Sequence, residues 1–413
     1  MSAATWESFL SEIAETSGPA FYFERAPVLG GAEPEGFYGL DPTEVFELSR
    51  PSDVEGLADR VAHSGKGAGG LFGYLGFDGF GLVEPLAAPS TPSGSPFPPG
   101  IFAHFPRLVR GRKRTPLGPS RPLPSLRTGA PKDRSRPASF ARSVRRLQRD
   151  ILDGEAFQVV LAHRRERPRE GSLLALVDRL RRRERYAYLF YFRFGSSDRA
   201  EVAGASPENV LELRGDRVAI DPIAGTRPRP PSPGTRRRLP LSRDAKELAE
   251  HRMLVDLARN DLGKVSRPGS VRVARSEVLV RYSRLEHLVS RVEGRLAPGQ
   301  DAVHALASAF PAGTVSGAPK IRATELLRRE EGTWRGPYGG ALGLFGPGPQ
   351  ADLALVIRAA FAWGPTLYTE AGAGIVQASR PAREWEETLQ KLSRLESLLE
   401  PDAPKGGRGP RGG

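Results

Sequence analysis

The sequence predicts an α+β protein built mainly on antiparallel sheets. Apolar strands follow one another with only short turns between most of them, at 155–161, 186–194, 210–213 and 218–220. Parallel strands would need crossovers of a dozen or more residues, so short turns favour antiparallel pairing. The last third alternates glycine turns with further apolar strands, at 338–345, 353–361 and 368–375. Stretches free of Pro and Gly predict helices at 5–16, 140–152, 246–261 and 321–329.

Composition divides the 413 residues into four predicted parts. These are a smaller α+β region at 1–106, a basic linker rich in Pro, Gly and Ser at 107–137, a catalytic domain at 138–400, and a flexible tail at 401–413. Between Arg107 and Arg149, fourteen Lys or Arg accompany one acid, Asp133, which accounts for the formal charge of +13. Because the linker has no aromatic residue to stack on bases, a solvated segment is favoured over specific nucleic-acid binding.

Several classes of protein are excluded by composition. No run of about 18 apolar residues is present, and the N-terminus lacks the basic start and apolar core of a signal peptide, so we expect a cytoplasmic protein without membrane contact. The chain has no cysteine. Disulfides, thiolate zinc sites and thiol nucleophiles are therefore excluded.

The helix predicted at 246–261 carries acids on a face that should be buried. At helical spacing one stripe holds Glu247, Glu250, Leu254, Leu257 and Asp261. Carboxylates beside leucines lose hydration and repel each other, so they need a cation to stay there. A bound divalent metal and ion pairs with Arg252 or Lys246 both satisfy that need.

A second set of spaced carboxylates occurs in the last predicted helix. Glu384, Glu387 and Lys391 fall on one face of it. Two helices that each present a carboxylate pair provide the hard oxygen ligands that magnesium (Mg²⁺) prefers. Glycine-bearing loops at 222–227 and 310–320 offer amide groups to an anion, with Lys320, Arg358 and Lys391 as cationic partners. The predicted ligand is a small polyanion held through a metal.

Several motifs in order resemble those of the chorismate-utilising enzymes, which include the large subunits of anthranilate and aminodeoxychorismate synthases and the isochorismate and salicylate synthases. The matching stretches lie between Gly154 and about Leu399: Gly-Glu-Ala-Phe-Gln-Val from 154, Ala-Ser-Pro-Glu from 205, Pro-Ile-Ala-Gly-Thr-Arg from 222, Lys-Glu-Leu-Ala-Glu-His from 246, His-Leu-Val-Ser from 287, Phe-Pro-Ala-Gly-Thr-Val-Ser-Gly-Ala-Pro-Lys from 310, and Gly-Ala-Gly-Ile-Val from 372. The N-terminal third matches mainly through the glycine-aromatic strand at 69–78.

The resemblance implies two antiparallel sheets packed face to face, flanked by helices, with the site between them. It implies a magnesium site made by Glu247, Glu250, Glu384 and Glu387. It places chorismate against Ala224, Gly225, Thr226, Tyr338, Arg358, Gly372, Ala373, Gly374 and Lys391. It identifies Glu208 as the acid that protonates the departing ring hydroxyl, with His287 and Thr314 assisting the second half-reaction. From its neighbours alone, His287 is explained more simply as a satisfied core histidine than as a catalytic group.

Two positions distinguish reactions within the family. Isochorismate and salicylate synthases place a lysine base where this chain has Gln158, and aminodeoxychorismate synthases commonly place a nucleophilic lysine where it has Ala224. An amide is no base and a methyl group forms no covalent intermediate, so ammonia addition that yields anthranilate is favoured. Aminodeoxychorismate synthase remains the alternative, and a basic nucleic-acid-associated protein with a vestigial enzyme core is a minor one.

Two further expectations concern regulation and ammonia supply. Tryptophan-inhibited relatives carry Leu-Leu-Glu-Ser near the start, and the nearest stretch in this chain ends in Glu24-Arg25. Because a bulky cation replaces the serine, the resemblance does not carry tryptophan feedback over to this chain. Relatives receive ammonia from a glutamine amidotransferase with a cysteine nucleophile. A chain without cysteine is therefore expected to use a separate amidotransferase subunit.

Overall fold

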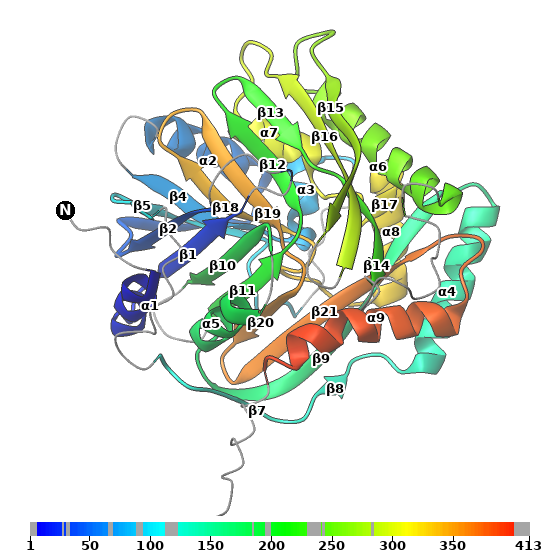
Figure 1. Ribbon diagram of the computed structural model, residues 1–413, viewed down its shortest axis with the longest axis horizontal. Coiled ribbons are helices and arrows are strands. Elements are labelled where there is room, and N and C mark those ends of the chain that lie inside the picture. Colours follow the sequence, from blue (N-terminus) through cyan, green and yellow to red (C-terminus); the bar gives the residue numbers. More distant parts are fainter. Residues whose placement is uncertain are drawn as a thin grey trace, which may run out of the picture.

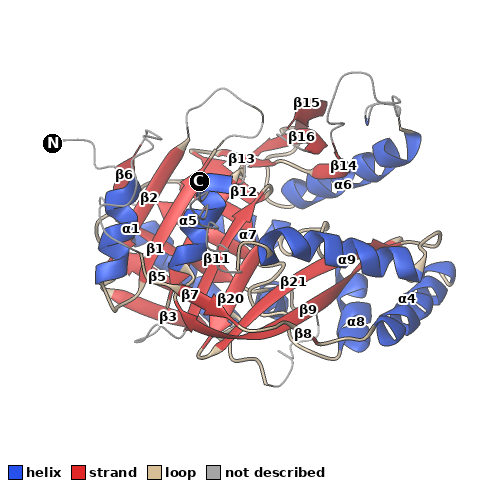
Figure 2. Ribbon diagram, turned by 60° about the horizontal axis from the view of Figure 1, so that its bottom comes forward, coloured by secondary structure: helices blue, strands red, loops and turns tan. Residues whose placement is uncertain are grey.

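The computed structural model describes residues 6–26, 29, 34–64, 69–87, 94–111, 123–183, 186–194, 200–228, 241, 244–281 and 285–399. The predicted tail at 401–413 lies outside them. Within these ranges the strands form two large sheets in which the neighbouring strands pair antiparallel (Figure 1). Helices cover the outer faces (Figure 2). The predicted α+β architecture of two antiparallel sheets with flanking helices is confirmed.

Both sheets combine strands that are far apart in the sequence. Across the first sheet the order is β17 (Gly317–Ala318), β9 (Gln158–Gly171), β21 (Thr366–Ile375), β20 (Ala359–Trp363), β11 (Ala200–Ser206), β10 (Tyr188–Arg193), β1 (Ala20–Arg25), β2 (Glu35–Leu40) and β6 (Val109–Gly111), with β7 (Leu126–Thr128) and β8 (Lys132–Asp133) also paired to β9. Across the second it is β14 (Ile223–Pro228), β16 (Leu285–Arg295), β13 (Arg217–Ile220), β12 (Asn209–Arg214), β19 (Gln350–Leu355), β18 (Ala341–Gly346), β4 (Gly70–Leu75), β5 (Gly100–Phe105) and β3 (Glu44–Leu48), with β15 (Arg272–Arg281) beside β16.

The helices are α1 (Trp6–Glu15), α2 (Pro51–Ser64), α3 (Phe80–Val83), α4 (Pro137–Leu152), α5 (Leu174–Arg183), α6 (Ala245–Gly263), α7 (Ala302–Ala309), α8 (Lys320–Glu331) and α9 (Pro381–Glu396), and a 3₁₀ turn, η1, spans Phe77–Gly79. Apolar residues of α1 and α5 pack on the first sheet, and those of α2 and α7 pack against strands of the second. No helix in the described ranges has the length and apolar character needed to cross a membrane.

Aromatic side chains hold the two sheets together. Alternate residues of β1 and β4 point to the same interior layer, where the rings of Phe21 and Phe72 stack with centroids 4.0 Å apart. The large buried area of such rings makes this layer a major contribution to stability. An ion pair also joins the sheets, because Arg25 of β1 contacts Asp352 of β19 at 2.9 Å.

Strands from the first 106 residues enter both sheets rather than forming a sheet of their own. β1 lies between β10 and β2, and β4 lies between β18 and β5. The predicted linker also contributes β6, β7 and β8. Its one acid, Asp133, contacts the buried His163 at 3.1 Å and Arg165 at 2.6 Å on β9. The domain boundaries stay a prediction, and residues 112–122 of the linker lie outside the described ranges.

Three local predictions were wrong. The strand predicted at 353–361 is divided between β19, which ends at Leu355 in the second sheet, and β20, which begins at Ala359 in the first. The segment 222–227, predicted as a loop, is largely strand β14, which pairs with β16 through a register shift between Ala224 and Thr226. The strand predicted at 155–161 begins only at Gln158 and continues to Gly171. Ion pairs from neighbouring elements to its arginines allow that extension, including Arg164 with Glu370 at 3.1 Å.

Candidate active site

The centre of the site is a buried carboxyl group, Glu208, in the turn between β11 and β12. The hydroxyl of Thr314 donates a hydrogen bond to its Oε1 at 2.9 Å. Burial raises the pKa of Glu208 to about 8, against a smaller lowering effect of the Thr314 hydrogen bond. A carboxyl group with that pKa stays protonated at neutral pH, which is the state required of a general acid.

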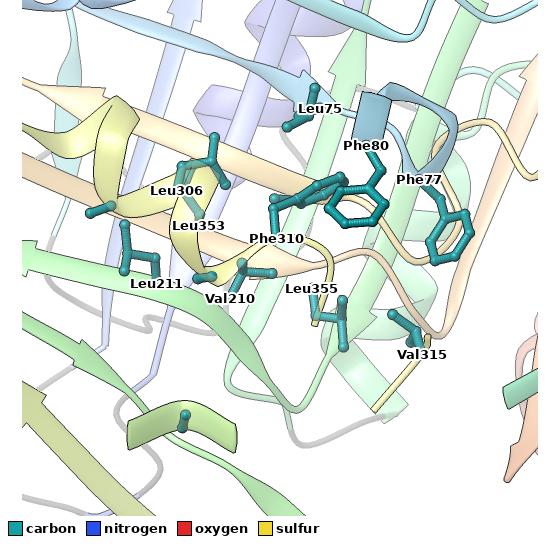
Figure 3. Packing of buried hydrophobic residues seen from close by; sticks show 14 of the residues in the cluster. Leu75, Phe77, Phe80, Val210, Leu211, Leu306, Phe310, Val315, Leu353 and Leu355 are labelled. Carbon is teal, nitrogen blue, oxygen red and sulfur yellow. The ribbon is translucent and has the colours of Figure 1, made fainter. Parts of the chain in front are cut away.

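The loop at 310–320 is held from two sides. Phe310 and Val315 flank Thr314 and both belong to an apolar cluster, in which the ring of Phe310 lies 6.4 Å from that of Phe80 (Figure 3). From the other side, Leu257 of α6 packs so closely on Gly313 that a Cβ there would lie 2.1 Å from its Cδ2. The leucines of the α6 stripe therefore pack on the Thr314 loop.

Glycines on β21 let other site residues approach its backbone closely. A Cβ on Gly372 would lie 3.1 Å from the hydroxyl oxygen of the buried Tyr338. A Cβ on Gly374 would lie 2.6 Å from the amide nitrogen of Gln158. Side chains at these two positions would fill the space where Tyr338 and Gln158 meet the strand, so glycine is what allows these two side chains to approach the backbone of β21.

Two cations are tied to the same region. The Lys391 ammonium donates to the carbonyl of Gly372 at 2.7 Å and contacts Glu387 at 2.6 Å. Arg358 donates to the backbone carbonyl of Lys391 at 2.8 Å. Its φ of 52° is a left-handed conformation that is unfavourable for a non-glycine residue. Strain of this kind often occurs at functional sites.

The remaining predicted residues lie on the second sheet and on α6. Thr226 of β14 stands opposite His287 of β16, and Ala224 opposite Leu288. His287 is buried, and α6 packs on both strands. Figure 2 shows α6 facing α9 and β21 across the molecule. The contacts among the predicted residues therefore join Glu208 with Thr314, Gln158 with Gly374, and Lys391 with Gly372, while His287 stands beside Thr226 on the second sheet.

Comparison with known proteins relates this geometry to a family. The model for the chorismate binding enzyme family matches residues 31–397. The chain belongs to that family. It is 36% identical to anthranilate synthase component 1 of Streptomyces coelicolor over 92% of this chain and 84% of that protein, and 38% identical to the same component of Methanothermobacter thermautotrophicus over 86% and 80%.

Solved structures agree with the fold. Anthranilate synthase component I from Streptococcus pneumoniae superimposes with a TM-score of 0.75 at 27% identity, covering 91% of this chain and 94% of that one. A putative 2,3-dihydroxybenzoate-specific isochorismate synthase from Bacillus anthracis gives a TM-score of 0.76 at 20% identity, over 95% and 98%. The second likeness concerns the fold alone.

The four glutamates predicted to bind magnesium lie on two helices, α6 and α9. Glu247 and Glu250 on α6, and Glu384 and Glu387 on α9, are half-buried carboxylates, which suit a hard divalent ion. Within the described ranges, however, no three or more His, Asp or Glu side chains are gathered where they would hold a metal. The donors fit magnesium in chemistry, while the two pairs do not form one group.

Lys320, expected to meet an anion, has another role. Its ammonium lies 2.6 Å from Asp261 of α6 and donates to the Ala309 carbonyl at 2.8 Å, with 9% of its side chain exposed. This buried ion pair ties α6 to the start of α8. Arg335, which no sequence motif singles out, is fully buried next to the site. Its position three residues before Tyr338 is the one signal in the sequence that points to it.

Proposed function

We propose that this chain is the chorismate-converting component of anthranilate synthase, which turns chorismate and ammonia into anthranilate, pyruvate and water. The observation that carries the proposal is the buried carboxyl group of Glu208, which accepts a hydrogen bond from the Thr314 hydroxyl and whose pKa burial raises to about 8, because such a group can serve as a general acid at neutral pH. The curated anthranilate synthase relatives support the same reading.

The first half-reaction needs an acid. The nitrogen of ammonia bonds to ring carbon 2, both ring double bonds shift by one position, and the bond from carbon 4 to its hydroxyl breaks. Glu208 gives its proton to the departing oxygen, which leaves as water. In the second half-reaction the proton on carbon 2 is removed and the bond from carbon 3 to the enolpyruvyl oxygen breaks. The enolpyruvate that leaves takes up one proton on its methylene carbon and becomes pyruvate. We assign assistance in this step to His287 and Thr314.

The choice of ammonia follows from two side chains that lack basic or nucleophilic groups. Gln158 reaches the backbone of Gly374, so its amide stands beside the proposed substrate but takes no proton from water. Ala224 offers only a methyl group on β14. With neither a base for water nor a lysine for covalent addition, a nucleophile that needs no activation is favoured.

Cations and amides would hold the two carboxylates of chorismate. Lys391 and Arg358 would supply positive charge, and backbone N–H groups of Gly372, Ala373 and Gly374 would donate hydrogen bonds to the substrate. Charge-assisted hydrogen bonds of this kind are about twice as strong as neutral ones, which suits a substrate with two carboxylates. Gly225 and Thr226 would approach from the opposite sheet.

Magnesium belongs to the proposal as well. Glu247, Glu250, Glu384 and Glu387 would hold it once α6 and α9 approach each other, and the bound ion would draw electron density into the ring carboxylate. Calorimetric titration of magnesium chloride into the protein tests this independently of turnover. Loss of the binding heat in Glu250→Gln and Glu387→Gln, but not in the exposed Glu386→Gln of the same helix, is expected. Unchanged heats in all three variants would contradict the assignment.

Product analysis tests the reaction. The protein is incubated with chorismate, magnesium chloride and ammonium chloride at alkaline pH, and the products are identified by fluorescence and mass. Anthranilate and pyruvate in equal amounts are expected, and Glu208→Gln should abolish both. Aminodeoxychorismate would instead assign the chain to the alternative synthase, and absence of any amino product would refute the proposal.

The source of ammonia is the last part of the proposal. Because the chain has no cysteine, we assign glutamine hydrolysis to a separate amidotransferase subunit. The purified chain should use ammonium salts and fail with glutamine. Glutamine-dependent turnover by this chain alone would contradict that assignment.

A further inference from the structure

Arg335 is the largest side chain that the structure buries almost completely, and its guanidinium group joins three parts of the chain. Nη1 donates to the Val315 carbonyl at 2.7 Å, and Nη2 donates to the Val160 carbonyl at 2.7 Å. Nε donates to Glu331 at 2.8 Å. The charge is thus paired, and its remaining donors hold the backbone of two segments far apart in the sequence.

Each of these segments carries a residue of the proposed site. Val315 follows Thr314, and Val160 lies two residues after Gln158 on β9. Tyr338 is three residues after Arg335 itself, and its N–H donates to the Arg335 carbonyl at 3.3 Å. Arg335 therefore contacts the segments of three site residues, two of them through its guanidinium group and the third through its backbone carbonyl.

Further contacts fix Glu331 and Arg335 in turn. Glu331 also accepts the N–H of Ala162 on β9 at 2.8 Å. The buried carboxylate of Asp78 accepts the N–H groups of Arg335 at 3.0 Å and Gly336 at 2.6 Å. The Arg335 guanidinium lies 4.2 Å from the centre of the Phe77 ring, a cation–π distance. Figure 3 shows Phe77 in the same cluster as Val315.

We propose that Arg335 is a positioning residue, which holds Gln158, Thr314 and Tyr338 at the spacing the reaction needs without contacting chorismate. The inference rests on the proposed function. A lysine would keep the charge but lose the planar fork that serves two carbonyls and a carboxylate at once. Arg335→Lys should therefore release the Thr314 loop while leaving most of the packing in place.

The chain offers a matched control. Arg169, near the far end of β9, is also buried, pairs with the buried Glu201, and donates to the carbonyls of Gly364 at 3.0 Å and Gly171 at 2.8 Å. It makes the same kinds of contact away from the site. Arg169→Lys therefore reports what the loss of such an arginine costs the fold alone.

The test is a double-mutant cycle in the ammonium-dependent assay. Arg335→Lys should lower kcat per folded molecule about 100-fold, whereas Arg169→Lys should stay within about threefold. Thr314→Ala should cost about 30-fold or more in the parent and less than about threefold in Arg335→Lys, because coupled residues are not additive. Multiplicative losses, or a kcat of Arg335→Lys equal to that of Arg169→Lys, would overturn the proposal.

Hydrogen exchange separates this proposal from the proposed reaction. The peptide covering 310–320 should exchange faster in Arg335→Lys and not in Arg169→Lys, whether or not the parent protein forms anthranilate. If Arg335→Lys does not fold, the same measurements are made on Asp78→Asn. This variant changes one carboxylate oxygen to an amide nitrogen in the side chain that accepts the backbone N–H groups of Arg335 and Gly336. Unchanged exchange of this peptide in whichever variant is used would overturn the positioning role.

Discussion

Replacing Glu208 with glutamine should remove activity and change how stability depends on pH. Burial raises the pKa of Glu208 to about 8. At pH 7 about nine tenths of the molecules then carry the proton, against about 0.3% for a glutamate of ordinary pKa. Loss of a general acid should lower kcat by about 10² to 10⁴-fold with little change in the KM for chorismate. In the parent protein, kcat should fall as pH rises above about 8.

The effect on stability has a definite sign. Between an unfolded pKa near 4.5 and a folded value of about 8, the native state holds a proton that the unfolded chain has lost. The free energy of unfolding of the parent therefore falls by about 1.4 kcal/mol per pH unit through this window as far as this group contributes. Glutamine carries no such proton. The free energy of unfolding of Glu208→Gln, relative to that of the parent, should therefore increase by about 1.4 kcal/mol per pH unit, or by about 3 kcal/mol between pH 5 and 7.

Urea unfolding at pH 5, 6, 7 and 8 measures this difference. Glu330→Gln is the control. Burial raises the pKa of Glu330, but hydrogen bonds from Arg146, Ser143 and Arg329 outweigh that effect and lower it. A carboxylate with a lowered pKa loses its stabilising effect only as pH falls below this window. The difference in free energy of unfolding between Glu330→Gln and the parent should therefore stay constant from pH 5 to 8. Equal pH dependence of Glu208→Gln and the parent would refute the account of a buried neutral acid.

Three other changes test separate parts of the structure. Lys320→Met leaves Asp261 buried without its cation and should lower the free energy of unfolding by about 3–5 kcal/mol, measured by urea unfolding. The double variant Lys320→Met, Asp261→Asn should lose less stability than the two single variants added together. Gly374→Ala places a Cβ 2.6 Å from the Gln158 amide and should lower kcat/KM for chorismate about tenfold in steady-state assays with normal unfolding. Arg358→Gly relieves a left-handed backbone but removes a cation and its hydrogen bond to the Lys391 carbonyl, so these two effects on stability should nearly cancel. The KM for chorismate should rise about 10- to 100-fold; an unchanged KM would contradict its role in binding.

Local sequence patterns predicted the elements whose signals are local. Glycine turns between apolar runs predicted antiparallel pairing, and the stripe on α6 predicted a face that is indeed partly buried against Gly313. The strand β14 was missed because Pro222 and Gly225 are typical of loops. Its strand conformation depends on pairing with β16, about 60 residues away along the chain.

The same limit applies to individual side chains. Lys320 follows a glycine-bearing loop, and this local sequence predicts that it binds an anionic ligand. In the structure its partner is instead Asp261 on another helix. Arg335 carries no motif of its own, and its contacts with Val160 and Val315 exist only after the sheet has formed. Glu208 was predicted by resemblance. Its raised pKa depends on burial, which no short pattern of residues specifies.

The way the first hundred residues interleave with the rest limits how this chain can be divided. A version beginning after residue 137 would lose one neighbour of β10 (β1) and one of β18 (β4), exposing one edge of each of these buried six-residue strands to solvent. Such edges promote intermolecular strand pairing and precipitation. A truncation, an exchange of the N-terminal part between homologues or a circular permutation should therefore keep both the β1–β10 and the β4–β18 pairings.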